Sequence, residues 1–335
     1  MSSVAGLAST RPRLALFAAA AVVAVIVLRR RRRREWRLED KLTVVISTSP
    51  TRTNPSTLLI EETVGSVRHH APDLTKCPTI VICDGYKVKP EPRYRSGQVT
   101  AEGGVLYEEY LNKVRKLKFG RVIVCKERQG FGFALKHALE YVKTPYVIVI
   151  QHDRNFIRDV DVEQVVRSME ANSSWLKYVH FPTSSTINYA RLMLSKYGLR
   201  IERRVAGGLE LWPLLQWYDS THVCEVAHYR GFVFRGDLVK KGGFVEDKLG
   251  QHQLAHIRTT GLAAHAEYGT FVVDAQGEPV VAHLDGHDRL AYRKFKFVDP
   301  GPEDLFPLEG PPPDVAASIA SVAAPAAEPD AQPTR

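Results

Sequence analysis

The chain has 335 residues, of which 44% are hydrophobic and 25% charged, so it has the composition of a globular protein with one large domain or two smaller ones. Its net charge of +9 is uneven, because residues 1–40 hold nine Arg and three acidic residues, whereas residues 301–335 hold one Arg and six acidic residues. The remaining excess is spread over the middle without a dense basic block or a nucleic-acid-binding motif, which argues against a nucleic-acid partner and favours an anionic substrate such as a nucleotide diphosphate.

The N-terminal region contains an unbroken apolar run of fifteen residues, Leu14–Leu28, followed by six Arg at positions 29–34. As a helix the run spans ~22 Å, and flanking Arg side chains can reach the membrane interfaces. Because no cleavage site of small residues follows, we expect a retained signal-anchor helix at 14–28, with an N-terminal segment at 1–13 and a basic linker at 29–40.

Two features of the sequence give opposite indications of the side of the membrane on which the following domain lies. The greater positive charge after the run places the following domain in the cytosol by the positive-inside rule. The sequence Asn172-Ser173-Ser174 is a glycosylation acceptor only if that domain is lumenal.

The middle of the chain alternates between apolar runs and segments of helical character. The runs predict strands at Thr43–Ile46, Ile80–Cys83, Val122–Cys125, Tyr146–Ile150 and Tyr178–Phe181. Helices are predicted from Asn54 through Val67 and over Gly104–Leu117 and Phe131–Val142. This alternation indicates an α/β domain at 41–300 with a mostly parallel central sheet and helices on both faces. Residues 301–335, with eight of the twenty Pro, predict a disordered Pro/Ala-rich tail.

The turn after the first predicted strand, Ser47-Thr48-Ser49-Pro50-Thr51-Arg52, contains no glycine. A dinucleotide-binding site needs G-x-G-x-x-G there, so that the backbone can approach the pyrophosphate. No G-x-x-x-x-G-K-[ST] occurs anywhere in the chain. The sequence therefore argues against a dehydrogenase, a P-loop NTPase and a pyrophosphorylase.

Acidic residues follow three apolar segments: Asp84, Asp153 and the pair Glu246-Asp247. Polar residues at the ends of neighbouring parallel strands converge on one cleft. A carboxylate in such a cleft can bind Mg²⁺ or Mn²⁺, and a second one can accept a proton from a hydroxyl. For Glu246-Asp247 the alternative is a pair of helix-capping acids.

Five collinear segments carry a resemblance to a known family. They are KLTVVISTSPTR, VICDGY, ERQGFGFALKHALEYVKTPYVIVIQHD, RGFVFRGDLVKKGGFVED and VVAHLDGH. Together they resemble the family-2-like glycosyltransferases, which are inverting nucleotide-sugar transferases with a GT-A fold. The resemblance covers roughly residues 41–295, and its most specific part is Gly-Gly-Phe-x-Glu-Asp.

The resemblance implies roles for individual residues. Asp153 matches the metal-binding aspartate of the family's Asp-x-Asp motif, and His283 matches a closing histidine that is a second candidate ligand. Gln151 stands in place of the first aspartate, where it can hydrogen-bond a ribose hydroxyl of the nucleotide sugar but supplies no charge. Asp247, beside Glu246, matches the general base. The nucleotide sugar would be held by Asp84 and by the loop containing Thr48, Ser49 and Arg52.

Three further side chains are candidates on weaker grounds. Lys136 and Arg235 can bind the diphosphate, although solvated surface charge is an equally good interpretation. Trp217 can stack on an acceptor, although core packing is the more common position for Trp.

The implied activity is transfer of a sugar from a UDP- or GDP-sugar to a glycan, lipid or protein acceptor, assisted by Mn²⁺ or Mg²⁺. The family analogy favours a single-pass protein of the Golgi or endoplasmic reticulum membrane. The alternative is a catalytically inactive, membrane-tethered binding or scaffold protein on a degenerate transferase domain, which the neutral Gln151 favours.

Overall fold

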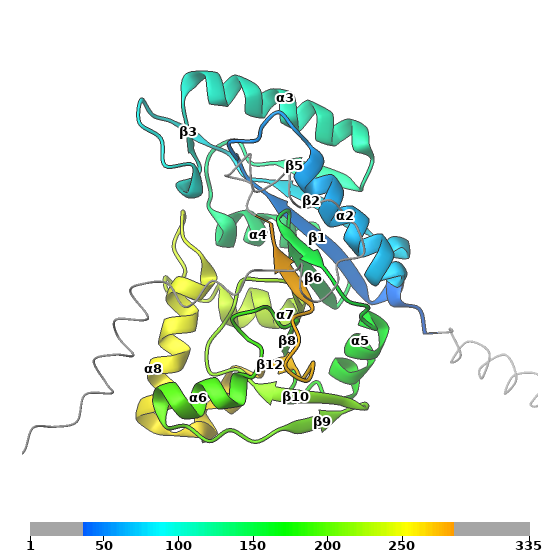
Figure 1. Ribbon diagram of the computed structural model, residues 1–335, viewed down its shortest axis with the longest axis vertical. Helices are drawn as coiled ribbons and strands as arrows, with labels where there is room; N and C mark the ends of the chain where they lie inside the picture. The colour runs from blue at the N-terminus through cyan, green and yellow to red at the C-terminus, as the bar shows by residue number, and fades with distance from the viewer. Residues whose placement is uncertain (1–35, 285–335) are drawn as a thin grey trace, which may run out of the picture. The chain divides into compact units, whose positions relative to one another are not determined.

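The computed structural model describes residues 36–284 (Figure 1). The predicted anchor at 14–28, the segment at 1–13, most of the linker at 29–40, the tail at 301–335 and the last residues of the predicted 41–300 domain lie outside the described residues. Within residues 36–284, no helix combines the length and the apolar character needed to cross a membrane.

The centre of the fold is a nine-stranded sheet with the order β5-β2-β1-β6-β11-β8-β12-β10-β9. Its strands are β1 (Leu42–Thr48), β2 (Thr79–Cys83), β5 (Arg121–Val124), β6 (Tyr146–Gln151), β8 (Tyr178–His180), β9 (Arg204–Ala206), β10 (Leu209–Pro213), β11 (His222–Glu225) and β12 (Thr270–Val273). Two small sheets pair β3 (Lys87–Val88) with β4 (Gln98–Val99) and β7 (Arg154–Phe156) with β13 (Val281–His283).

The α-helices are α2 (Leu58–His70), α3 (Ala101–Leu117), α4 (Phe131–Leu139), α5 (Val162–Ala171), α6 (Tyr189–Tyr197), α7 (Val226–His228) and α8 (Gln251–Thr260). Short 3₁₀-helices are η1 (Leu38–Asp40), η2 (Pro72–Lys76), η3 (Tyr94–Ser96) and η6 (Leu262–Glu267). Two π-helices are η4 (Tyr229–Val233) and η5 (Glu246–Gly250).

The predicted α/β architecture, the mostly parallel central sheet and the five predicted strands are confirmed. Strands β5, β2, β1 and β6 run parallel to one another, whereas β11 is antiparallel to both of its neighbours, β6 and β8. Strand β8 is parallel to β12, and β10 is antiparallel to β12 and β9. Seven of the eight strands missed within residues 36–284 have two to four residues, and runs of this length are too brief to show a period.

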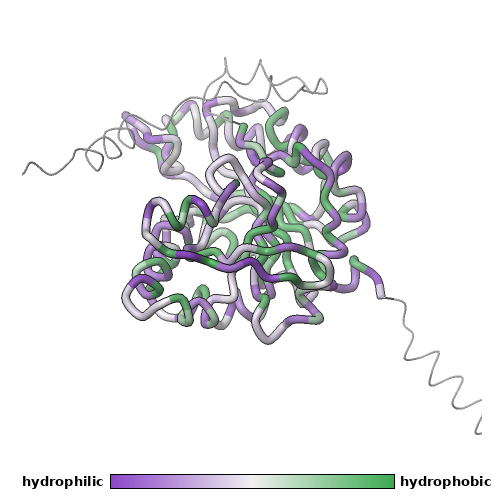
Figure 2. The backbone as a smooth tube through the Cα atoms, turned by 60° about the horizontal axis from the view of Figure 1, so that its bottom comes forward, coloured by the Kyte–Doolittle hydropathy of each residue, from purple (hydrophilic) through white to green (hydrophobic). Residues whose placement is uncertain are grey.

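Both faces of the sheet are covered. Helices α2, α3 and α5 pack on one face, and α4, α6 and α8 pack on the other. Strand β6 shows why its sequence is continuously apolar: Ile148 and Ile150 point into the first core, whereas Val147 and Val149 point into the second. In Figure 2 the hydrophobic parts of the trace gather in the interior and the hydrophilic parts lie on the outer turns.

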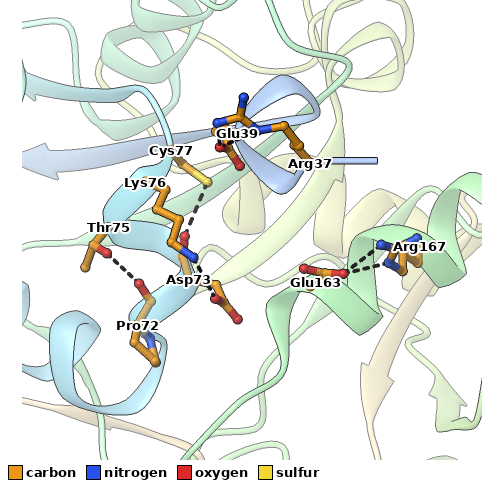
Figure 3. Close-up of polar contacts among 9 residues, drawn as sticks. All are labelled: Arg37, Glu39, Pro72, Asp73, Thr75, Lys76, Cys77, Glu163 and Arg167. Carbon is orange, nitrogen blue, oxygen red and sulfur yellow. Dashed lines mark hydrogen bonds and ion pairs between the residues drawn. The ribbon is translucent and has the colours of Figure 1, made fainter. Parts of the chain in front are cut away.

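The start of the described chain is held mainly by apolar packing. Figure 3 shows the polar contacts around η1 and η2, including an ion pair between Arg37 and Glu39 and one between Lys76 and Asp73 at 3.8 Å. Exposed pairs of this kind contribute only ~0–1 kcal/mol each. Leu74, in contrast, is 1% exposed, and burying a Leu side chain contributes roughly 1.5–3 kcal/mol.

Candidate active site

The parallel strands β1, β2 and β6 end beside one cleft with a volume of about 390 Å³. This is the edge of an open α/β sheet at which ligands bind. Seven of the residues predicted from the sequence line the cleft: Thr48, Ser49, Asp84, Gln151, Asp153, Glu246 and His283. The other five are not among its lining residues: Arg52, Lys136, Trp217, Arg235 and Asp247.

Asp153 and His283 meet although they are 130 positions apart in the sequence. Pairing of β13 with β7 brings them together, and His283 Nε2 lies 3.2 Å from Asp153 Oδ2. Burial alone would raise the pKa of Asp153, but the hydrogen bond to His283 and the charges of His152 and Arg154 lower it to about 2. The carboxylate is therefore ionised at neutral pH.

The donor set of this pair fits a divalent cation. The other oxygen of Asp153, Oδ1, is buried and has no hydrogen-bond partner among residues 36–284. In the same part of the chain, no group of three or more His, Cys, Asp and Glu side chains is arranged around a metal position. Mg²⁺ is commonly bound through one or two carboxylates together with substrate phosphates, so the Asp153 carboxylate with the His283 imidazole beside it is a workable set.

Gln151, at the end of β6, makes a hydrogen bond within the protein that an aspartate at this position could not make. Its side-chain Nε2 donates a hydrogen bond to the backbone carbonyl of Asp219 at 2.8 Å. An ionised carboxylate has no proton to donate. The neutral side chain at this position therefore helps to fix the segment around Asp219.

The sequence analysis missed Asp219, an acidic residue of the cleft that forms a reciprocal pair with Glu246. The backbone N–H of Asp219 donates to Glu246 Oε2 at 3.1 Å, and the backbone N–H of Glu246 donates to Asp219 Oδ2 at 3.0 Å. Trp217 Nε1 donates to the other Asp219 oxygen at 3.1 Å. The sequence feature that could have indicated this residue is an acidic side chain between the aromatic residues Trp217-Tyr218 and the strand that begins at His222.

Both carboxyl groups of this pair have raised pKa values. Burial raises the pKa of Asp219 to about 8, and the negative charges of Glu246 and Asp247 add to this effect against the two hydrogen bonds that it accepts. Burial also raises the pKa of Glu246, with a further contribution from Asp247. Perturbed acids that share a cleft are typical of functional sites.

Two residues that the sequence analysis assigned to the site, Asp247 and Trp217, do not line the cleft. Asp247 is the second residue of η5, and its side chain is exposed. Trp217 is 0% exposed, and its ring packs between Tyr178 and Tyr229 at centroid distances of 4.3 and 5.3 Å. Trp217 therefore has no free face for an acceptor and reaches the site only through its hydrogen bond to Asp219.

The predicted nucleotide-binding residues at the ends of β1 and β2 are largely engaged within the protein. Thr48 Oγ1 lies 2.7 Å from Tyr110 Oη and 2.6 Å from His152 Nδ1. The Asp84 carboxylate accepts three backbone N–H groups, from Gly85, Gln129 and Gly130, at 2.7 to 2.9 Å. Asp84 thus anchors the loop that leads into α4.

The cations of the cleft are Arg128 and Arg154, which the sequence analysis did not select. The Nε atom of each is buried without a hydrogen-bond partner among the described residues. Lys136 and Arg235 are exposed, and Lys136 lies over the rings of Phe133 and Phe234. Arg52 lies over Tyr94 at 5.6 Å, in a second hollow of about 470 Å³ that shares Tyr94 with the cleft.

No model of a protein family and no curated protein sequence matches the chain. Among solved structures it is similar to mannosyltransferase PcManGT from Pyrobaculum calidifontis in complex with GDP-Man and Mn²⁺, with 15% identity over 63% of this chain and 55% of that one and a TM-score of 0.33. It is also similar to glucosyl-3-phosphoglycerate synthase from Mycobacterium tuberculosis with Mn²⁺ and UDP, with 14% identity over 78% and 82% of the two chains and a TM-score of 0.38.

A third similar structure is a CMP:2-keto-3-deoxy-manno-octonic acid synthetase complexed with CTP, with 15% identity over 72% of this chain and 92% of that one and a TM-score of 0.37. The mannosyltransferase belongs to the class of enzyme that the sequence motifs resemble, and the chain spans about half of its length. At these TM-scores the likeness is distant and assigns no activity to this chain.

Proposed function

We propose that this chain is a glycosyltransferase that moves a sugar from a UDP- or GDP-sugar to an acceptor hydroxyl, with metal assistance and inversion. One observation carries the proposal: a single cleft combines three chemical functions that such a transfer needs. These are the carboxylate–imidazole pair, two guanidinium groups and the reciprocal pair of carboxyl groups, contributed by Asp153, His283, Arg128, Arg154, Asp219 and Glu246.

The donor diphosphate is bound by the positive side of the cleft. Arg128 and Arg154 each have a buried N–H without a partner among the described residues, and phosphate oxygens are acceptors that match a guanidinium group. Ser49 contributes a further hydroxyl group to the lining of the cleft, whereas the Thr48 hydroxyl is already engaged by Tyr110 and His152. A divalent ion held by Asp153 and His283 would stabilise the negative charge of the departing diphosphate.

The acceptor hydroxyl is activated by a carboxylate. In the proposed step Glu246 takes the hydroxyl proton, the acceptor oxygen bonds to the anomeric carbon, and the bond from that carbon to the diphosphate oxygen breaks. Attack opposite the leaving group inverts the configuration. A raised pKa makes Glu246 a stronger base than an ordinary carboxylate and suits proton abstraction near neutral pH.

Glu246 is a better candidate for this role than its neighbour Asp247, to which the family resemblance assigned it. Glu246 lines the cleft, whereas Asp247 is exposed and is not among the lining residues. Asp247 still acts on the site through its charge, which raises the pKa values of Glu246 and Asp219.

The proposal includes attachment to a membrane through the apolar run at 14–28, in the Golgi or endoplasmic reticulum. The supporting features are the run itself and the absence of a small-residue cleavage site after it in the sequence. Loss of membrane association on replacing residues 14–28 with a polar linker is the expected result, measured by carbonate extraction of isolated membranes.

The donor site is tested by thermal unfolding of the whole chain with UDP, GDP or CDP, with and without Mn²⁺. A rise in Tm that requires Mn²⁺ and one particular nucleotide, and that disappears in Asp153→Ala, is expected. The result would also identify the base of the donor. If no nucleotide raises Tm, the glycosyltransferase proposal is wrong.

The second candidate is a non-catalytic scaffold that keeps the transferase architecture. Gln151 favours it, because the carboxylate that the family usually has at this position is absent. The two candidates differ in turnover: a transferase releases nucleotide diphosphate from its donor sugar in the presence of an acceptor, whereas a scaffold binds nucleotide or nothing and releases none.

A further inference from the structure

Two phenylalanines form a stacked aromatic pair on the wall of the cleft. Phe131, the first residue of α4, and Phe244, two positions before Glu246, both line it. Their ring centroids are 5.7 Å apart with an interplanar angle of 21°. Phe244 is 41% exposed, which places it among the few large apolar side chains of residues 36–284 that remain open to solvent.

Backbone contacts hold this pair in place from both sides. The turn before Phe244 is tied to the loop before Phe131, because Gly242 N–H donates to the Gln129 carbonyl at 2.5 Å and Gly132 N–H donates to the Gly243 carbonyl at 3.3 Å. Arg128 Nη2 also donates to the Gly242 carbonyl at 2.8 Å.

The contact between the two segments is close. A Cβ atom added to Gly130 would lie 2.6 Å from the backbone of Gly242, so only glycine allows this approach. The loop before Phe131 is itself anchored by Asp84. The aromatic pair is therefore preorganised, and binding against it costs little conformational entropy.

We infer that the Phe131–Phe244 pair is the acceptor subsite and that the acceptor is a carbohydrate, whose ring stacks on Phe244 with a hydroxyl directed at Glu246. This inference rests on the proposed function. A sugar ring has an apolar C–H face and hydroxyls around its rim. The exposed ring of Phe244 complements the C–H face, and Glu246, two positions later in the sequence and in the same cleft, complements a hydroxyl.

The rest of the cleft favours a sugar over a lipid chain. An acyl or prenyl chain needs a continuous apolar channel, but the cleft that contains the aromatic pair is also lined by charged and amide groups, among them Arg128, Gln151, Arg154 and Asp219. Burying an alkyl chain there would desolvate these groups without giving them hydrogen-bond partners. Sugar hydroxyls can supply such partners.

The experiment is saturation-transfer NMR on the whole chain in lipid nanodiscs, without donor, using cellobiose, maltose, chitobiose and mannobiose as probes. At least one disaccharide is expected to receive saturation at ring C–H protons. Phe244→Ala should weaken its binding about tenfold, the order of one aromatic contact, whereas Phe244→Tyr should keep it. Leu262→Ala, which alters another exposed apolar residue outside the cleft, is the matched control and should have no effect.

The inference is overturned if none of the disaccharides binds, if Phe244→Ala binds as wild type does, or if octyl phosphate instead gives the Phe244-dependent signal. Nucleotide binding in the same samples, read by thermal shift, reports separately on the donor site. A chain that binds nucleotide but shows no Phe244-dependent sugar contact retains the proposed function and loses the carbohydrate subsite. A chain that binds the disaccharide but no nucleotide loses the proposed function.

Discussion

Asp84 offers a direct test of how the cleft is held together. Its two carboxylate oxygens accept backbone N–H groups from Gly85, Gln129 and Gly130, and the side chain is 5% exposed. Asp84→Asn keeps one acceptor oxygen but turns an amide N–H₂ towards an N–H donor. A buried donor left without a partner costs about 1–3 kcal/mol, so we expect a loss of that size in the free energy of unfolding. Asp84→Ala leaves all three backbone N–H donors without an acceptor and should lower the free energy of unfolding by about 3 kcal/mol or more.

Urea unfolding followed by tryptophan fluorescence measures this loss through the denaturation midpoint. Asp73→Asn is the control, because the Asp73 side chain is 51% exposed and its ion pair with Lys76 spans 3.8 Å. Its effect should stay under about 0.5 kcal/mol. If Asp84→Asn is equally harmless but abolishes nucleotide binding, then Asp84 contacts the nucleotide and does not act by anchoring the loop.

The remaining predictions concern the carboxylates of the cleft. Glu246→Gln should lower the rate of sugar transfer at least a hundredfold while leaving nucleotide-induced Tm shifts intact, whereas Asp247→Asn should keep most of the activity; the reverse ranking in a diphosphate-release assay would return the role of base to Asp247. Because burial raises the pKa of Asp219 to about 8, the folded chain holds a proton that the unfolded chain releases above about pH 4. Its contribution to stability is therefore complete below about pH 4 and is lost as the pH rises to about 8, and urea midpoints should fall over this range less steeply in Asp219→Asn than in wild type; identical slopes would contradict the raised pKa. Lastly, Asp153→Asn should reduce Mn²⁺-dependent nucleotide affinity tenfold or more in calorimetric titrations but leave metal-free affinity nearly unchanged, and equal losses with and without Mn²⁺ would argue against a metal ligand.

The parallel half of the sheet could be predicted from the sequence because its strands are buried on both faces. In β6 successive residues enter opposite cores, so the run from Tyr146 to Ile150 is apolar throughout and stands out from its surroundings. The same burial explains why Asp153 could be predicted as a site residue. The first charged side chain after such a run lies at the carboxyl end of the strand, where ligands bind. The antiparallel β11 was missed because its sequence, His222–Glu225, buries a His and a Cys without an apolar run.

The carboxylate pair could not be predicted from local sequence. Asp219 and Glu246 lie 27 positions apart, in segments without a hydrophobic period, and each becomes important only because the other's backbone N–H faces it. Arg128 and Arg154 could not be predicted either, because nothing in the sequence of the loop after β5 or at the start of β7 indicates that their Nε atoms are buried. Such pairings arise from tertiary structure, which a one-dimensional pattern does not contain.

Gln151 connects these two halves of the site and gives its departure from Asp-x-Asp a physical explanation. A carboxylate at this position would face the carbonyl of Asp219, to which Gln151 now donates a hydrogen bond, and two acceptors would then meet. It would also add negative charge to the cleft that holds Asp219 and Glu246, whose pKa values are already raised by burial and by the charge of Asp247. A neutral donor therefore suits a cleft in which the carboxyl groups of Asp219 and Glu246 come together, and in the proposed transferase it leaves Asp153 and His283 as the candidate ligands of a metal ion.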